Sequence, residues 1–260
     1  MAIASVGRLQ VIDGIEFLRI AGAGRQIAAR SVVPLRRQRQ WTSEEPPALE
    51  KNERSFYYVP MSTPTTISKG AATRDLIIDH AYAIACRTGL EGISIGDLAQ
   101  AVGMSKSGVF AHFGSREDLQ LAVLENGGRR FGEAVLLPAL RKPRGIARLR
   151  AIVDGWFDWV RENQHGCLIM GAVSEYDSRP GALHDAVVGL IQRWRSDTAR
   201  AAQMAIDAGE LHADADPQQL SFEIFGIALA LHQDTRLFDP KQARSRAEHA
   251  VQRLLAAHSR

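Results

Sequence analysis

The sequence holds few side chains whose types and spacing could support covalent or metal chemistry. Its two cysteines, Cys86 and Cys167, lie far apart in the chain, so they form neither a disulfide framework nor a Cys-x-x-Cys zinc site. The histidines lack the spacing of metal ligands on one helix face, and no Ser/His/Asp order or paired carboxylates form a catalytic pattern. We therefore expect no enzyme, no metal site and no cofactor, and thiol oxidation is the one reactive chemistry left.

Hydroxyl and basic side chains between residues 94 and 119 form a different kind of pattern. The segments Ser94-Ile-Gly-Asp and Ser115-Arg-Glu-Asp each place a serine three residues before an acid, which is typical of a helix N-terminus. Ser105 precedes another short helical pattern, whose spacing leaves Lys106 and Ser107 facing outward. Polar groups thus collect at the starts of short helices.

The elements that position these groups form a helix-turn-helix. Apolar periodicity predicts four helices, over about 71–88, 94–102, 105–113 and 115–135. We expect Gly103 to adopt a positive φ in the turn, Phe110 and Phe113 to pack inward, and the fourth helix to end before Pro138. Two short helices joined by a tight glycine-containing turn, with a third behind them, are a helix-turn-helix.

Residues 71–131 resemble the DNA-binding domain of the tetracycline-repressor (TetR) family of bacterial transcription regulators, and residues 61–260 match the usual length of its members. The resemblance implies an all-α fold: a three-helix helix-turn-helix domain, then a helical ligand-binding and dimerisation domain at 144–260. It implies that the helix at 105–113 enters the DNA major groove. The residues expected to contact DNA are Ser105, Lys106, Ser107, Gly108, Phe110, His112 and Arg116.

Two positions depart from the family pattern. Phe110 stands where the family often has tyrosine, which removes a hydroxyl–phosphate bond, and Ala111 replaces a frequently polar residue. Base readout then falls on Lys106 and Ser107, with apolar contact from Ala111 to a thymine methyl group. The serines at the helix starts are explained equally well as N-caps.

The rest of the chain also has helical patterns. The segments in question are 144–163, 166–175, 183–209, 217–238 and 240–257. In the TetR family the middle helices hold an inducer pocket, so the resemblance implies a small-molecule site. Its candidate lining residues are Trp156, Trp159, Met170, Glu175, Trp194 and Phe222. The apolar members also fit plain core positions, whereas Glu175 either pairs with Arg179 or another base, or awaits a polar ligand group.

The last two helices are candidates for a dimer interface. Small residues such as Gly226 and Ala230 lie on one side of the helix at 217–238 and allow close approach by another helix. In the family, this pair of helices builds a four-helix interface. A symmetric dimer presents two recognition helices to a palindromic operator, with half-sites about one helical turn apart.

The composition of the 260-residue chain is that of a globular protein, with 45% hydrophobic and 23% charged residues. Charges interrupt each apolar stretch before it reaches the roughly 18 to 20 residues that cross a bilayer, which excludes a membrane span. The scarcity of cysteine favours a reducing compartment, so we expect a cytoplasmic protein.

Residues 1–60 differ from the rest of the chain. They hold nine Arg and Lys against six Asp and Glu, which accounts for the whole formal charge of +3, and they show no sustained helical or strand period. We expect a poorly ordered extension and take Met61 as the true start. The alternative is a basic arm that adds phosphate contacts.

Together these patterns predict a dimeric, sequence-specific transcriptional regulator. The expectation is a repressor that a small-molecule inducer releases from a palindromic operator in double-stranded DNA. Its partners are then the operator, a second copy of the chain and an unidentified inducer, with no membrane. The alternative is a thiol-based redox sensor in which Cys167 or Cys86 replaces the ligand pocket.

Overall fold

The computed structural model describes residues 10–12, 15–17, 69–163 and 166–259. The chain forms two compact units, Met1–Met61 and Ser62–Arg260. Most of the first unit lies outside the described residues, and so do the expected disorder of residues 1–60 and the expected start at Met61.

The described part of the first unit is a short strand pair. The strands β1 (Gln10–Ile12) and β2 (Ile15–Phe17) run antiparallel, with Val11 opposite Glu16. The sequence pattern did not predict these strands, because three residues are too few to show the period-two alternation on which such a prediction depends.

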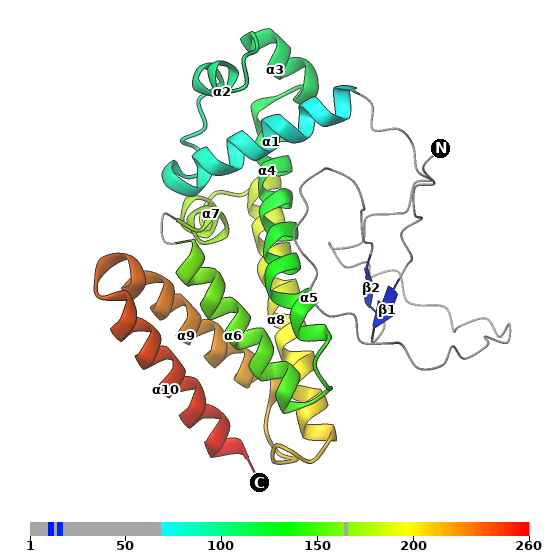
Figure 1. The fold of residues 1–260 in the computed structure, drawn as a ribbon, viewed down its shortest axis with the longest axis vertical. Coiled ribbons are helices and arrows are strands. Elements are labelled where there is room, and N and C mark those ends of the chain that lie inside the picture. Colours follow the sequence, from blue (N-terminus) through cyan, green and yellow to red (C-terminus); the bar gives the residue numbers. More distant parts are fainter. Residues whose placement is uncertain (1–9, 13–14, 18–68, 164–165, 260) are drawn as a thin grey trace, which may run out of the picture. The chain divides into compact units, whose positions relative to one another are not determined.

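The described residues of the second unit are helical (Figure 1), which confirms the all-α class expected for this part of the chain. The elements are α1 (Lys69–Thr88), α2 (Ile95–Ala101), α3 (Lys106–Phe113), α4 (Arg116–Phe131), the π-helical turn η1 (Gly132–Leu136), α5 (Leu137–Leu140), α6 (Ile146–Glu162), α7 (Leu168–Tyr176), α8 (Ala182–Asp207), α9 (Pro217–Leu237) and α10 (Pro240–His258). Figure 1 shows α2 and α3 beside α1 and the start of α4, and α9 alongside α10.

Serine caps begin the helices around the turn, as the sequence predicts. The hydroxyl groups of Ser94, Ser105 and Ser115 accept hydrogen bonds from backbone amides in the first turns of α2, α3 and α4. Each cap satisfies an amide that has no partner within its helix, an arrangement that contributes about 1 kcal/mol.

The fourth helix, α4, ends at Phe131, before Pro138 as expected, but helical structure does not stop there. The chain continues from α4 through η1 directly into α5, and Pro138 lies in the first turn of α5. A proline is tolerated there because the first amides of a helical segment need no partner within it, and the wider π-helical turn precedes it.

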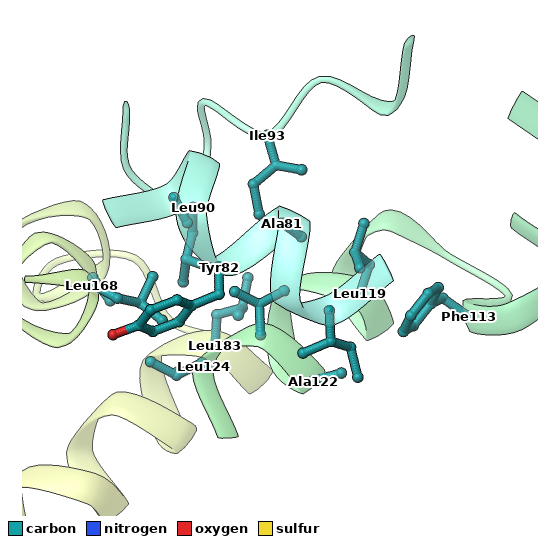
Figure 2. Close-up of a cluster of buried hydrophobic side chains, with 14 of the residues drawn as sticks. Ala81, Tyr82, Leu90, Ile93, Phe113, Leu119, Ala122, Leu124, Leu168 and Leu183 are labelled. Carbon is teal, nitrogen blue, oxygen red and sulfur yellow. The ribbon is translucent and has the colours of Figure 1, made fainter. Parts of the chain in front are cut away.

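One apolar core joins the helix-turn-helix to the C-terminal helices. Leu98, Val109 and Phe113 from α2 and α3 belong to the same buried cluster as Leu168 of α7 and Leu183 of α8. Figure 2 shows Leu168 next to Tyr82 of α1, at the place where the two regions meet. The predicted segments 71–131 and 144–260 therefore lie in one compact unit and share a core.

Candidate nucleic-acid interface

The turn between α2 and α3 holds the two helices at a fixed angle through backbone geometry. Gly103 has φ of +69°, the left-handed conformation that the sequence predicts for it. The amide of Met104 donates to the carbonyl of Ala99 at 2.9 Å, which closes the turn. Val109 and Phe113 of α3 are buried against the core, so the opposite face of α3 points to solvent.

The solvent face of α3 carries most of the predicted DNA-contact residues. Ser105, Lys106 and Ser107 are exposed, and the Ser105 and Ser107 hydroxyl oxygens lie 3.0 Å apart. Gly108 and His112 are half-buried beside this face. The start of α3 thus presents hydroxyl groups and one cation together, which suits phosphate oxygens and base edges.

Phe110 does not pack inward, which corrects the sequence-based expectation. Its side chain is 41% exposed, whereas Phe113 is 7% exposed in the core. Val109 and Phe113 form the buried face of α3, and Phe110 lies beside them at the surface. Its ring therefore adds an exposed apolar group to the solvent face of α3.

The side chain of Lys106 extends back across the start of α2. A Cβ built on Gly96 would lie 3.3 Å from Cε of Lys106, so the lysine stem runs over this glycine. The first amides of a helix carry partial positive charge, and the ammonium group adds a full charge beside them. Gly96 thus allows the cation to lie between the starts of α2 and α3.

Arg116 makes contacts within the protein that the sequence did not predict. Its Nη2 atom donates to the backbone carbonyl of Glu91 at 2.5 Å and lies 3.2 Å from the Glu91 carboxylate. The side chain is 46% exposed, so the pair is a screened surface pair of modest strength. An anion that binds Arg116 at the start of α4 must therefore compete with Glu91 for this guanidinium.

The predicted ligand-binding tryptophans form an aromatic cluster at the core of the C-terminal helices. Phe131 lies edge-on to Trp194 with ring centroids 4.6 Å apart, and Trp156 lies 4.8 Å from Trp194. Trp156 and Trp194 are buried, so they fill the core. Trp159 differs, because its buried indole N–H faces the Cys167 thiol and has no oxygen or nitrogen acceptor within the described residues.

The other ligand candidates lie apart from that cluster. Met170 is half-buried on α7, whereas Phe222 is 59% exposed on α9 with the guanidinium of Arg195 5.1 Å from its ring. Phe222 therefore does not line an interior site in the single chain.

Glu175 has neither of the roles that the sequence suggested. Its Oε2 atom accepts hydrogen bonds from the backbone amides of Leu90, at 2.9 Å, and Glu91, at 3.4 Å. Arg179 instead lies 3.6 Å from the Glu91 carboxylate, to which the Tyr176 hydroxyl also donates at 2.8 Å. The acid on α7 thus binds the loop between α1 and α2.

Two sequence profiles of known protein families match this chain. The profile described as bacterial regulatory proteins, tetR family, matches residues 77–123, and the profile described as tetracyclin repressor-like, C-terminal domain, matches residues 145–251. The first match spans the helix-turn-helix and the second spans most of α6 to α10. The chain belongs to the TetR family of bacterial transcription regulators.

Individual TetR-family proteins show the same relationship. The transcriptional regulator AcuR of Cereibacter sphaeroides is 26% identical over 144 residues, which cover 54% of this chain and 64%, less than two thirds, of AcuR. A TetR regulator from Chloroflexus aurantiacus has a TM-score of 0.65 and 24% identity, covering 72% of this chain and 94% of that one. A TetR-family regulator from Cytophaga hutchinsonii has a TM-score of 0.68 and 17% identity, and the match covers 75% of this chain and 98% of that one. At such identities the structural likeness shows the fold.

The two cysteines of this TetR-family chain are neighbours in space. The Cα atom of Gly166, next to Cys167, lies directly against the backbone carbonyl of Cys86, and the two thiols interact electrostatically. Burial raises the pKa of the Cys167 thiol, which keeps it protonated and lowers its reactivity. Burial, together with Cys86, also raises the pKa of the Tyr82 hydroxyl.

Other kinds of site are not found in the described part of the chain. Among residues 69–163 and 166–259, no group of His, Cys, Asp and Glu side chains could hold a metal ion. No helix in the same ranges has the length and apolar character needed to span a bilayer.

Asp197 is a half-buried acid on α8 that the sequence patterns did not identify. Its spacing from Trp194 and Ala201, on the apolar stripe of α8, is the signal that could have identified it. Burial raises the pKa of this carboxyl from 3.8 to about 6, although Arg200 and Arg193 partly oppose the shift.

The raised pKa of Asp197 predicts how stability changes with pH. The folded state holds the proton more tightly than the unfolded state, so this group lowers the free energy of unfolding as pH rises from 3.8 to about 6. We expect Asp197→Asn to be about 1 kcal/mol more stable than wild type at pH 7.5 and equally stable near pH 3.5. Urea unfolding at the two pH values measures this, and an equal difference at both would contradict it.

Proposed function

We propose that this protein is a dimeric, sequence-specific DNA-binding regulator, most simply a repressor that a small molecule releases from a palindromic operator. Residues 71–131 then bind DNA and residues 144–260 bind the ligand and a second copy, in the cytoplasm where the DNA lies. The observation that carries the proposal is the exposed start of α3, with Ser105, Lys106 and Ser107 on a rigid helix-turn-helix. Short helices with this exposure are suited to the major groove.

A solved relative gives an example of both ligands in one protein of this fold. The structure of AibR contains isovaleryl coenzyme A and operator DNA, and it matches this chain with a TM-score of 0.55 and 21% identity, covering 72% of this chain and 98% of that one. The ligand releases the protein from the operator when it binds more tightly to the conformation that fits the operator less well. A ligand shifts such an equilibrium only through a difference in its affinity for the two conformations. Trp159 and Asp197 are two polar groups of the C-terminal helices that we assign to the recognition of such a ligand.

The surface of α9 and α10 supports the proposed dimer. A shallow groove between these helices is lined by Glu223, Gly226, Ile227, Ala230, Ala250, Arg253 and Leu254. Phe222 and Leu229 of α9 are also exposed, at 59% and 39%. Apolar side chains in contact with solvent along a pair of helices are stabilised by burial against a second pair, which a two-fold axis supplies.

A thiol-based sensor is the second candidate. The closeness of Cys86 and Cys167 favours it, because an oxidant such as peroxide could join them, while the buried, protonated Cys167 thiol opposes it. Operator affinity that stays the same after peroxide treatment would exclude this function.

Fluorescence anisotropy tests the proposed function directly. The full chain is titrated onto the DNA that flanks its own gene and onto a scrambled duplex of equal length, over a series of salt concentrations. We expect tight binding to the flanking DNA alone, with an affinity that falls steeply as salt rises. Equal, weak binding to both duplexes would contradict sequence-specific recognition at this site.

Replacing Lys106 tests the position of the recognition helix. We expect Lys106→Ala to weaken operator binding about tenfold and to lower the salt dependence by about one ion, because an ammonium at the start of α3 binds phosphate or guanine. The matched control is Lys142→Ala, an exposed lysine between α5 and α6. If Lys106→Ala and Lys142→Ala bind alike at every salt concentration, α3 does not bind DNA through this residue.

A further inference from the structure

The loop between α1 and α2 is held by side chains from two other helices. Gly89 ends α1 with φ of +78°, and the buried Leu90 follows it. The Leu90 amide donates to Glu175 of α7 at 2.9 Å, while its carbonyl accepts a hydrogen bond from the buried Gln120 of α4 at 2.9 Å. Both polar groups of a buried backbone unit thus depend on distant side chains.

The contact between Glu175 and the loop leaves no space for an additional atom. A Cβ built on Gly89 would overlap the Glu175 carboxylate, so the acid lies directly against the glycine Cα. The same carboxylate accepts from the Glu91 amide at 3.4 Å. Glu175 therefore fits this loop by shape as well as by hydrogen bonds, and only glycine at position 89 permits the fit.

The remaining contacts between α7 and the DNA-binding helices are mainly apolar. Leu168, Ala172 and Tyr176 of α7 pack in the shared core against α1 and α4, and Figure 2 shows Leu168 beside Tyr82. Apolar packing has no preferred direction, so it permits small rotations of one helix over another. Hydrogen bonds lose strength rapidly as their geometry changes, so those of Glu175 select one orientation.

The two ends of α7 lie in different regions of the molecule. Its first turn follows Cys167, whose thiol lies against the indole N–H of Trp159, and its last turn carries Glu175 and Tyr176 to the loop after α1. The Tyr176 hydroxyl donates to the Glu91 carboxylate, which also pairs with Arg116 at the start of α4. A movement of α7 therefore acts on the helix-turn-helix at its loop.

We propose that Glu175 is a positioning residue that fixes the orientation of the helix-turn-helix on the C-terminal helices, and through it the separation of the two recognition helices on DNA. The effect on DNA rests on the proposed function, whereas the effect on orientation does not. Without Glu175, the buried Leu90 amide loses its acceptor and α2 and α3 sample a range of orientations. The protein then no longer distinguishes between operators whose two half-sites are separated by different distances.

The first test measures orientation without DNA. Spin labels on unnatural amino acids at Ala111 of α3 and Gln203 of α8, both exposed, report the distance between these helices in the full chain. We expect a narrow distance distribution for wild type and about a twofold broader one for Glu175→Ala. Glu175→Gln retains a carbonyl acceptor and restores the narrow distribution. An unchanged width in Glu175→Ala with intact helical content would overturn the proposal.

The second test measures operator spacing. A palindromic duplex, selected from random sequence by the wild-type protein, is compared with the same duplex carrying one inserted base pair between the half-sites. We expect Glu175→Ala to bind the original duplex about tenfold less tightly than the wild-type protein does. On the inserted duplex, the variant and the wild-type protein should have nearly the same affinity. Glu175→Gln keeps the wild-type preference. A wild type that selects no duplex refutes the proposed function, and the spin-label distances still decide the role of Glu175.

Two further variants separate positioning from general loss of stability. Glu133→Ala removes a carboxylate that pairs with Arg129 one turn away on continuous helix, at 2.8 Å, so it leaves the orientation and spacing preference unchanged. Gly89→Ala displaces the Glu175 carboxylate from the opposite side and reproduces the Glu175→Ala result in both tests. If Glu133→Ala has the same effects as Glu175→Ala, the proposal is wrong.

Discussion

Replacing Gly166 with alanine is expected to lower the free energy of unfolding by about 3 kcal/mol, the largest stability effect of any single substitution considered for this chain. Gly166 has φ of +145°, a conformation that residues with a Cβ rarely adopt. Its added Cβ would overlap the backbone carbonyl of Cys86. Because a backbone carbonyl cannot rotate away as a side chain does, α1 and the start of α7 must separate to make room.

The matched control is Gly171→Ala, five residues along the chain within α7. A Cβ at this position meets nothing within 4 Å and the backbone is helical, so we expect no loss, or a gain of about 0.5 kcal/mol. Guanidinium unfolding followed by circular dichroism measures both variants. Equal stabilities for the two would show that Gly166 does not pack on Cys86 as described.

Replacing Gly226 with tryptophan is expected to weaken operator binding by about a hundredfold or more, the largest functional effect. Gly226 is exposed and a Cβ there meets nothing within 4 Å, so we expect the ring to extend into solvent and leave the fold of the protomer intact. Gly226 lines the groove between α9 and α10 that the proposed dimer covers. A monomer binds one half-site at a time and loses the gain in affinity from two linked contacts.

Analytical ultracentrifugation and DNA anisotropy together check this expectation. Ala147→Trp, on an exposed position of α6, introduces the same ring outside the groove and should leave both the dimer and operator binding intact. A Gly226→Trp protein that is still dimeric places the interface elsewhere. One that is monomeric with undiminished operator affinity would show that dimerisation is not needed for recognition.

The amino-acid sequence by itself determined the local features of this fold. The capping serines at positions 94, 105 and 115, the positive φ of Gly103 and the helical periods depend on residues within one or two turns of each other, and all were predicted. The exposed face of α3 followed from the same periodicity, except for Phe110. Local patterns also located α3 and the turn before it, because a helix-turn-helix is itself a local structure.

Only the tertiary structure decided which distant residues meet. Glu175 and Leu90 are separated by 85 residues, and no periodicity in the sequence relates them. The sequence therefore did not predict that the partner of Glu175 is a backbone amide rather than a basic side chain or a ligand. The pairing of Arg116 with Glu91 and the closeness of Cys86 to Cys167 arise in the same way. These contacts depend on how α1, α4 and α7 cross, and that crossing is set by packing of the whole core rather than by any single segment.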